Sequence, residues 1–149
     1  MVRDTFDEIV NNVDVRQNLS KLRQEIKEES NKYALLYYIG EKKDIIPALL
    51  ESEDAKTRKN AALLMGDLAL EEYLPYIIKG YQKEEQRFIK SSYLVALRSF
   101  DYREYLPFLK ECLDNLLGIK LTPENKKHTE EEIRELTALI VSMEGVKKH

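Results

Sequence analysis

Apolar residues recur through most of this chain at the three- and four-residue spacings of an amphipathic helix. A shorter apolar series in residues 4–13 predicts a first helix, and residues 32–39 predict the third. The second helix is predicted over about 15–29 from the series Val15, Leu19, Leu22 and Ile26.

An apolar motif with a central proline then occurs three times. Its prolines are Pro47, Pro75 and Pro107, which lie 28 and 32 residues apart, and each motif is followed by a second helical stretch. A proline in the first turn of a helix costs little, because the N–H that it lacks has no partner within the helix. Self-similarity at this period predicts an array of helical hairpins, each burying its apolar face against its neighbours. The expected hairpins pair residues 42–51 with 55–69 and 71–83 with 86–100, and a further one opens at 102 and continues to 117.

The end of the chain has a different pattern. Residues 118–129 lack helical periodicity and have the composition of a loop. Thr129 and the glutamates after it form a capping box, which predicts the start of a last helix. We therefore expect helical repeats with an N-terminal helix in 1–117, a loop in 118–129, and a C-terminal helix in 130–149 that caps the array or leads into a further domain.

Composition supports an all-α fold. The 149 residues are 43% hydrophobic and 34% charged, with only 5 Gly and 4 Pro, which is too apolar for disorder and too poor in turn residues for an all-β protein. This length suits one domain with a substantial core. No apolar run approaches the roughly 18 residues needed to span a bilayer. The polar, acidic N-terminus is unlike a signal peptide, so we expect a cytoplasmic protein without membrane contact.

Residues 57–68 resemble the second helix of a HEAT repeat, and the proline-bearing first helices are similar to those of the same family. The resemblance extends over about 31–117 and implies a right-handed α–α superhelix, a HEAT-like solenoid of about three to four helical hairpins. Residues 86–100 depart from it, with Tyr93 and Leu94 in place of alanines and Arg98 in place of the glycine. The matching positions are Arg58, Ala61, Ala62, Met65, Gly66 and Leu68.

The small residues of this motif have a physical role. Ala61 and Ala62 allow a neighbouring helix to approach closely, and Gly66 is tolerable within a helix if backbone contact requires it. By resemblance, the partner of Arg58 is expected to be an acidic residue of an adjoining turn, such as Asp54 or Asp67.

Catalytic chemistry is not indicated. His128 and His149 have no cysteine, serine or second histidine at a spacing that suggests a triad or a zinc site. The single cysteine, Cys112, lies beside apolar helix positions and is expected to be a small buried residue. The glycines are scattered singly, so no phosphate loop is present. We expect no enzyme activity in this chain, no cofactor and no metal.

The candidate site is therefore a surface. In HEAT arrays the second helices line the concave side, where this chain has more basic than acidic residues, although an ordinary mixed surface is the simpler interpretation. Tyr37 and Tyr38 are adjacent, so they do not face the same way along a helix, and one of them is a candidate interface aromatic. The candidate concave-face residues are Lys56, Arg58, Lys59, Arg87, Lys90 and Arg98.

Two functions fit these features. The first is a non-catalytic HEAT-repeat scaffold that binds a protein partner through its concave face. The second is an N-terminal domain that targets RNA or a ribonucleoprotein for a longer bacterial enzyme, such as an RNA methyltransferase, since some of these enzymes have similar repeats. Salt-dependent binding through the basic helices distinguishes nucleic-acid contact, although the net charge of −3 gives no global reason to expect it.

Overall fold

The computed structural model describes residues 1–147, and this part of the chain is all-helical, as the sequence predicts. Short 3₁₀ turns lie at Gly40–Asp44, Leu49–Glu51, Glu71–Tyr73 and Arg103–Tyr105, on both sides of α4 and directly before α6 and α8. The α-helices are α1 (Val2–Val10), α2 (Val15–Glu25), α3 (Glu29–Ile39), α4 (Ile45–Ala48), α5 (Ala55–Leu68), α6 (Leu74–Lys83), α7 (Arg87–Leu97), α8 (Leu106–Leu117) and α9 (Lys126–Lys147).

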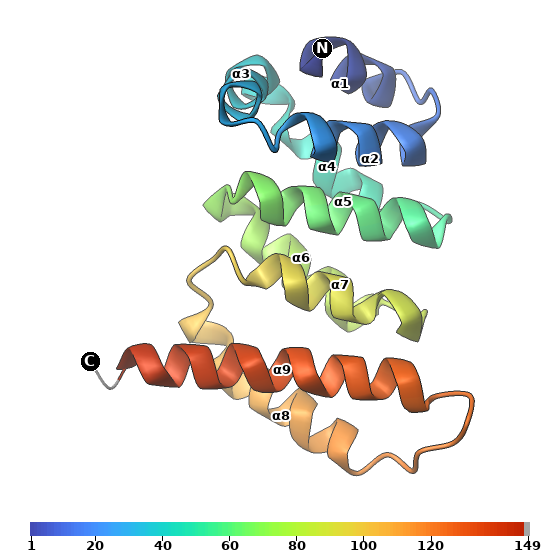
Figure 1. Cartoon of the computed structure of the whole chain (residues 1–149), viewed down its shortest axis with the longest axis vertical. Coiled ribbons are helices and arrows are strands. Elements are labelled where there is room, and N and C mark those ends of the chain that lie inside the picture. Colours follow the sequence, from blue (N-terminus) through green and yellow to red (C-terminus); the bar gives the residue numbers. More distant parts are fainter. Residues whose placement is uncertain (148–149) are drawn as a thin grey trace.

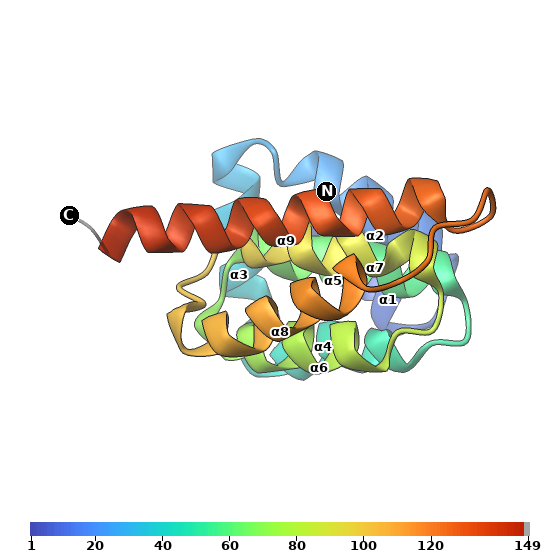
Figure 2. The same cartoon turned by 90° about the horizontal axis from the view of Figure 1, so that it is seen from below.

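The helices form two layers. Figure 1 shows α2, α5, α7 and α9 side by side, one below the other, in the front layer. Seen from below, α4, α6 and α8 form the second layer (Figure 2). Helices α4, α6 and α8 pack against α5, α7 and α9 respectively, and α1 packs against α2. Consecutive helix pairs therefore stack in chain order, while α3 is seen nearly end-on beside α1 (Figure 1).

The prolines lie where the motif predicts. Pro75 and Pro107 occupy the first turns of α6 and α8, and Pro47 lies in the short helix α4. Because a proline has no N–H to donate, each is placed where the helix does not require one. The three motifs thus begin equivalent helices of the second layer.

The last helix begins earlier than the sequence predicts, at Lys126 rather than at residue 130. Thr122 and Asn125 exchange hydrogen bonds, in which each backbone N–H donates to the other's side-chain oxygen, at 2.8 and 3.3 Å. The N–H of Thr129 donates to the carbonyl of Asn125, so Thr129 lies inside the helix and does not cap it. Residues 148–149, which the sequence predicts as the end of this last helix, lie outside the described residues.

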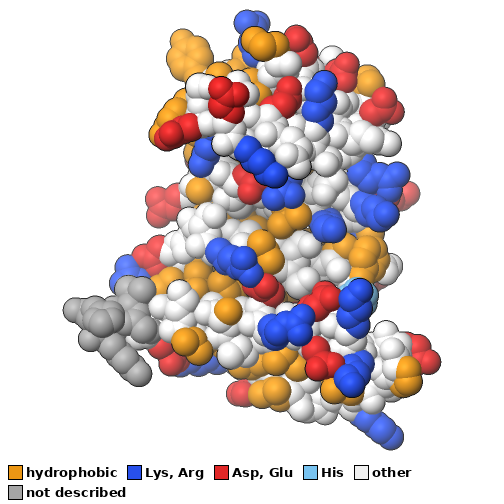
Figure 3. Space-filling view, viewed as in Figure 1, with side chains coloured by type: hydrophobic (Ala, Val, Ile, Leu, Met, Phe, Trp, Pro, Cys, Tyr) orange, Lys and Arg blue, Asp and Glu red, His pale blue; other side chains and the backbone are white. Residues whose placement is uncertain are grey.

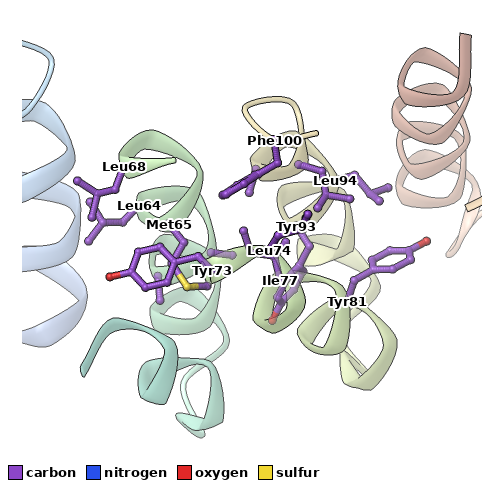
Figure 4. Packing of buried hydrophobic residues seen from close by; sticks show 14 of the residues in the cluster. Leu64, Met65, Leu68, Tyr73, Leu74, Ile77, Tyr81, Tyr93, Leu94 and Phe100 are labelled. Carbon is purple, nitrogen blue, oxygen red and sulfur yellow. The ribbon is translucent and has the colours of Figure 1, made fainter. Parts of the chain in front are cut away.

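Buried side chains form a core that continues from one helix pair to the next. Figure 4 shows Tyr73 beside Met65, and Ile77 between α6 and α7 with Tyr93. All four are almost completely buried. The hydroxyl of Tyr73 donates to the carbonyl of Lys43 at 3.0 Å, which links the start of the third pair to the second. Burial raises the pKa of Tyr73, because it disfavours the phenolate.

Helices α5 and α7 are in contact at Gly66. A Cβ atom at this position would lie 2.7 Å from the Cα of Ala96 and 3.0 Å from its Cβ. Ala61 and Ala62 on the same helix are fully buried. The sequence expectation of a close helix approach is therefore confirmed, and Ala96 is the residue that approaches.

We predict that Gly66→Leu destabilises the protein by about 3 kcal/mol, because the new side chain overlaps backbone atoms of α7. Urea unfolding followed by circular dichroism at the helical band measures the change. The matched control is Gly118→Leu, because a Cβ at Gly118 meets nothing closer than 3.6 Å. Equal stabilities for the two variants would contradict the close-contact interpretation.

Candidate functional site

The outer sides of the neighbouring helices α5 and α7 carry several side chains that are fully or partly exposed to solvent. On α5, Lys56 is exposed while Lys59 and Leu63 are half-buried, and their spacing of three and four residues places them on one side of the helix. On α7, Phe88 is 41% exposed and Val95 is half-buried. Together with Ser91, these residues form what we call the α5–α7 face: Lys56, Lys59, Leu63, Phe88, Ser91 and Val95.

Basic residues outnumber acidic ones on three helices of the front layer. Figure 3 nevertheless shows blue and red side chains interspersed over this layer, with hydrophobic side chains between them. Neighbouring helices and loops supply acidic residues that pair with the basic residues of this layer. A count of the charges on each helix alone therefore overstates how basic the surface is. In detail, α2 has Arg16, Lys21 and Arg23 against Glu25, α5 has Lys56, Arg58 and Lys59 against Asp67, and α7 has Arg87 and Lys90 with no acidic residue.

The side chain of Arg58 is hydrogen-bonded to two turns, the one before α5 and the one between α6 and α7. Its Nε and Nη2 each donate to the carboxylate of Glu84 at 2.9 Å, and its Nη1 donates to the carbonyls of Ser52 and Glu53. Glu84 lies in the turn between α6 and α7, so the expectation of an acidic partner from an adjoining turn is confirmed, whereas the two named candidates, Asp54 and Asp67, are wrong. Asp54 instead caps α5 by accepting from Thr57, and Asp67 accepts from Arg23. Asp54 is thus used within α5 and Asp67 binds the neighbouring helix α2, while Glu84 reaches Arg58 from the next hairpin.

Glu84 joins three structural elements. Its side chain is 1% exposed and also accepts from the hydroxyl of Tyr93 at 2.7 Å and from the N–H of Gln86 at 3.0 Å. Burial favours the neutral acid, but the hydrogen bonds from Arg58, Tyr93 and Gln86 outweigh it and lower the pKa of Glu84. Burial, with the adjacent carboxylate, raises the pKa of Tyr93.

Glu132 on α9 has a similar arrangement. It accepts from the hydroxyl of Tyr81 on α6, and from Nη1 of Arg87 on α7 at 3.0 Å. Burial and this carboxylate raise the pKa of Tyr81. The ammonium of Lys90 lies 4.6 Å from the centre of the Tyr81 ring, in cation–π contact. Arg87 and Lys90 are thus directed toward other helices of the protein.

Only two of the six predicted basic residues meet on the α5–α7 face. Lys56 and Lys59 are there and have no salt bridge within the described part of the chain. Arg58 and Arg87 bind glutamates, Arg98 binds Glu135 at 2.6 Å, and Lys90 covers Tyr81. The sequence analysis did not predict Phe88 as a surface residue. Its exposure could have been inferred from its position directly before Ile89, the first buried residue of α7, because neighbouring residues of a helix face different directions.

The two candidate tyrosines lie on α3, away from this face. Tyr37 is 92% exposed. Tyr38 is half-buried, donates from its hydroxyl to Asp7 at 2.6 Å and packs its ring edge-on against Phe6. The guanidinium of Arg3 lies 4.8 Å from the same ring. Tyr37 is therefore the exposed member of the pair.

Within residues 1–147 the structure shows neither a helix long and apolar enough to cross a membrane nor a group of three metal-binding side chains. His128 is half-buried, with Nδ1 3.5 Å from Glu131 and its ring beside Phe88. His149 lies outside the described residues. Cys112 is half-buried, and burial raises the pKa of its thiol, which disfavours the reactive thiolate.

We predict that Glu84→Gln destabilises the protein by about 3 kcal/mol at neutral pH, because Arg58 is left without its buried anion. Since the folded-state pKa of Glu84 is lowered, its contribution is present above the ordinary carboxyl pKa and is lost as pH falls through the folded value. Urea unfolding should therefore show the two proteins converging at acidic pH. The control Glu85→Gln changes an exposed neighbour and should cost less than about 0.5 kcal/mol. An equal cost for both would contradict the role of Glu84.

We also predict that alkaline pH unfolds the protein through its buried tyrosines. The raised folded-state pKa of Tyr93 means that its contribution is complete below a pH of about 10 and is lost as pH rises above that value. Tyr93→Phe should therefore lose less unfolding free energy than the wild type between about pH 9 and about pH 11. The control Tyr37→Phe, altered at an exposed ring, should lose as much as the wild type. The same alkaline loss in all three proteins would contradict the prediction.

Comparison with protein-family models, with curated proteins and with solved structures found no match to this chain. The interpretation of the α5–α7 face therefore depends on the exposure, charge and neighbours of its own side chains.

Proposed function

We propose that the chain is a non-catalytic interaction module, built as a HEAT-like helical-repeat array, that binds an acidic protein segment through the α5–α7 face. The stacking of helix pairs in chain order supports the repeat interpretation. The close contact at Gly66 supports it too, because the glycine belongs to the motif that resembles the family.

One observation carries the binding proposal. Lys56 and Lys59, which have no salt bridge among the residues described, lie on α5, and the neighbouring helix α7 carries the exposed ring of Phe88. Exposed aromatic rings are common anchors in protein interfaces. Lysines near such an anchor attract carboxylates and direct the approach of an acidic partner. An amphipathic segment with acidic residues beside an apolar side chain fits both features.

The arrangement favours a protein over nucleic acid. Binding a phosphate backbone with useful affinity needs several cations that are free to contact phosphates. Most arginines of this layer are engaged within the protein, since Arg23, Arg58, Arg87 and Arg98 all bind carboxylates. The remaining lysines suit contact with a few carboxylates.

The proposal is tested by fluorescence anisotropy with a labelled amphipathic peptide of leucine and glutamate, and with structured RNA and duplex DNA, at two salt concentrations. We predict that the peptide binds, and that the double variant Lys56→Glu/Lys59→Glu weakens binding by at least about tenfold, because it reverses both charges of the face. Phe88→Ala should weaken binding at high salt as well, since its contact is apolar.

The control is Lys32→Glu/Lys120→Glu, which makes the same charge change at residues away from the face. It should change the affinity by less than about twofold. RNA or DNA binding that is lost in the first variant, with no peptide binding, would replace the protein partner with nucleic acid. Equal losses in both double variants would show that only net charge matters.

A further inference from the structure

A hollow with a volume of about 840 Å³ lies on the second layer, between α4 and α6. Its walls include Pro47 and Leu50 from one side and Tyr76 and Gly80 from the other. Figure 2 shows these two helices in the lower layer, below α5 and α7. A hollow of this size is within the range that proteins use to bind a ligand or a partner's side chains. We call it the α4–α6 groove.

Two exposed ion pairs join the helix pairs on either side of the groove. Lys43 binds Glu72 at 3.3 Å, and Lys83 binds Glu51, which lines the groove, at 2.9 Å. Each pair contributes little stability by itself, so the walls are held mainly by the packing of their helices.

Gly80 lies where the groove wall packs closely on its neighbours. A Cβ atom there would lie 2.7 Å from the ring of Tyr93 and 3.4 Å from Leu50, so this position packs tightly without a side chain. On the opposite wall Ala48 is exposed and short. Both walls of the hollow therefore include a residue with little or no side chain.

The floor of the groove is chemically satisfied. Arg58, Glu84 and Tyr93 line it, and they are hydrogen-bonded to one another. A charged ligand would have to displace these buried bonds at considerable cost. An apolar side chain resting between Pro47, Leu50 and Tyr76 would not, and Tyr76 is 45% exposed and available for such a contact.

The rim is acidic. The carboxylates of Asp44, Glu53 and Glu85 line the groove, are exposed, and form no salt bridge within the described residues. Lys79 is the one lysine of the lining that lacks a salt bridge in the described structure. A partner that brings basic residues to this rim gains charge complementarity, whereas an acidic partner is repelled.

We propose that the α4–α6 groove docks a basic segment of a second protein, with an aliphatic side chain between Pro47, Leu50 and Tyr76 and lysine or arginine residues against Asp44, Glu53 and Glu85. This surface lies on the layer opposite the α5–α7 face and has the opposite charge preference. With both surfaces occupied, the module joins an acidic partner to a basic one.

The test uses a labelled amphipathic peptide of leucine and lysine, and anisotropy with the full chain. The peptide is expected to bind the wild type, and Glu53→Lys/Glu85→Lys is expected to weaken it by at least about tenfold. Ala48→Trp, which fills the groove from an exposed position, should weaken it as much without changing the charge. Melting temperatures within a few degrees of the wild type show that the variants remain folded.

Two controls separate the groove from general electrostatics and from the α5–α7 face. Glu104→Lys/Glu111→Lys makes the same charge change on exposed residues outside the groove and should alter the affinity by less than about twofold. Lys56→Glu/Lys59→Glu should bind the basic peptide at least as well as the wild type, so failure of one surface is distinguishable from failure of the other.

Three outcomes would overturn the proposal. The first is no binding, or equally tight binding of the leucine–glutamate peptide in the groove. The second is equal weakening by the groove and control charge reversals. The third is self-association of the unlabelled protein in sedimentation velocity that Ala48→Trp abolishes, which would assign the groove to a second copy of the chain.

Discussion

The carboxylate of Glu84 is the interaction on which the middle of this molecule depends. This buried carboxylate accepts hydrogen bonds from the side chains of Arg58 on α5 and Tyr93 on α7, and from a backbone N–H at the start of α7. A buried charge is costly unless its lone pairs are satisfied, and here they are. The loop between α6 and α7, the start of α5 and the body of α7 are therefore positioned together. The floor of the α4–α6 groove is a direct result of this arrangement.

Tyrosine hydroxyls connect different elements of the chain, both between helix pairs and within them. Tyr73 donates to a carbonyl of the preceding pair, Tyr81 and Tyr93 donate to buried glutamates, and Tyr102 donates to the carbonyl of Leu139 on α9 at 2.7 Å. In each case the ring fills apolar space while the hydroxyl satisfies a polar group of another element. This explains how a chain with 9 tyrosines and no tryptophan places several of them in its core.

The sequence predicts features that depend on near neighbours along the chain. The prolines mark equivalent helices, and the alanine and glycine positions of α5 indicate the close approach of α7, because both follow from local helix geometry. The partner of Arg58 does not, since Glu84 lies 26 residues away and is brought to it only by the stacking of hairpins. The sequence misplaces the start of α9, because the N–H groups of Lys126 and Thr129 donate to the carbonyls of Thr122 and Asn125, which places Thr129 inside the helix. The candidate basic surface was reduced to two lysines for a similar reason, as long-range carboxylates engage the arginines.

The contact between Gly66 and Ala96 has a mechanical consequence. It places backbone against backbone, with no flexible side chain between α5 and α7 to be compressed or extended. Such a contact sets how closely the two helices approach, because neither backbone can move further toward the other. Helix α4 packs on α5 and α6 packs on α7, so the space between α4 and α6 is built on the same two helices as the α5–α7 face. A substitution that pushed α5 away from α7 would therefore alter both surfaces at once.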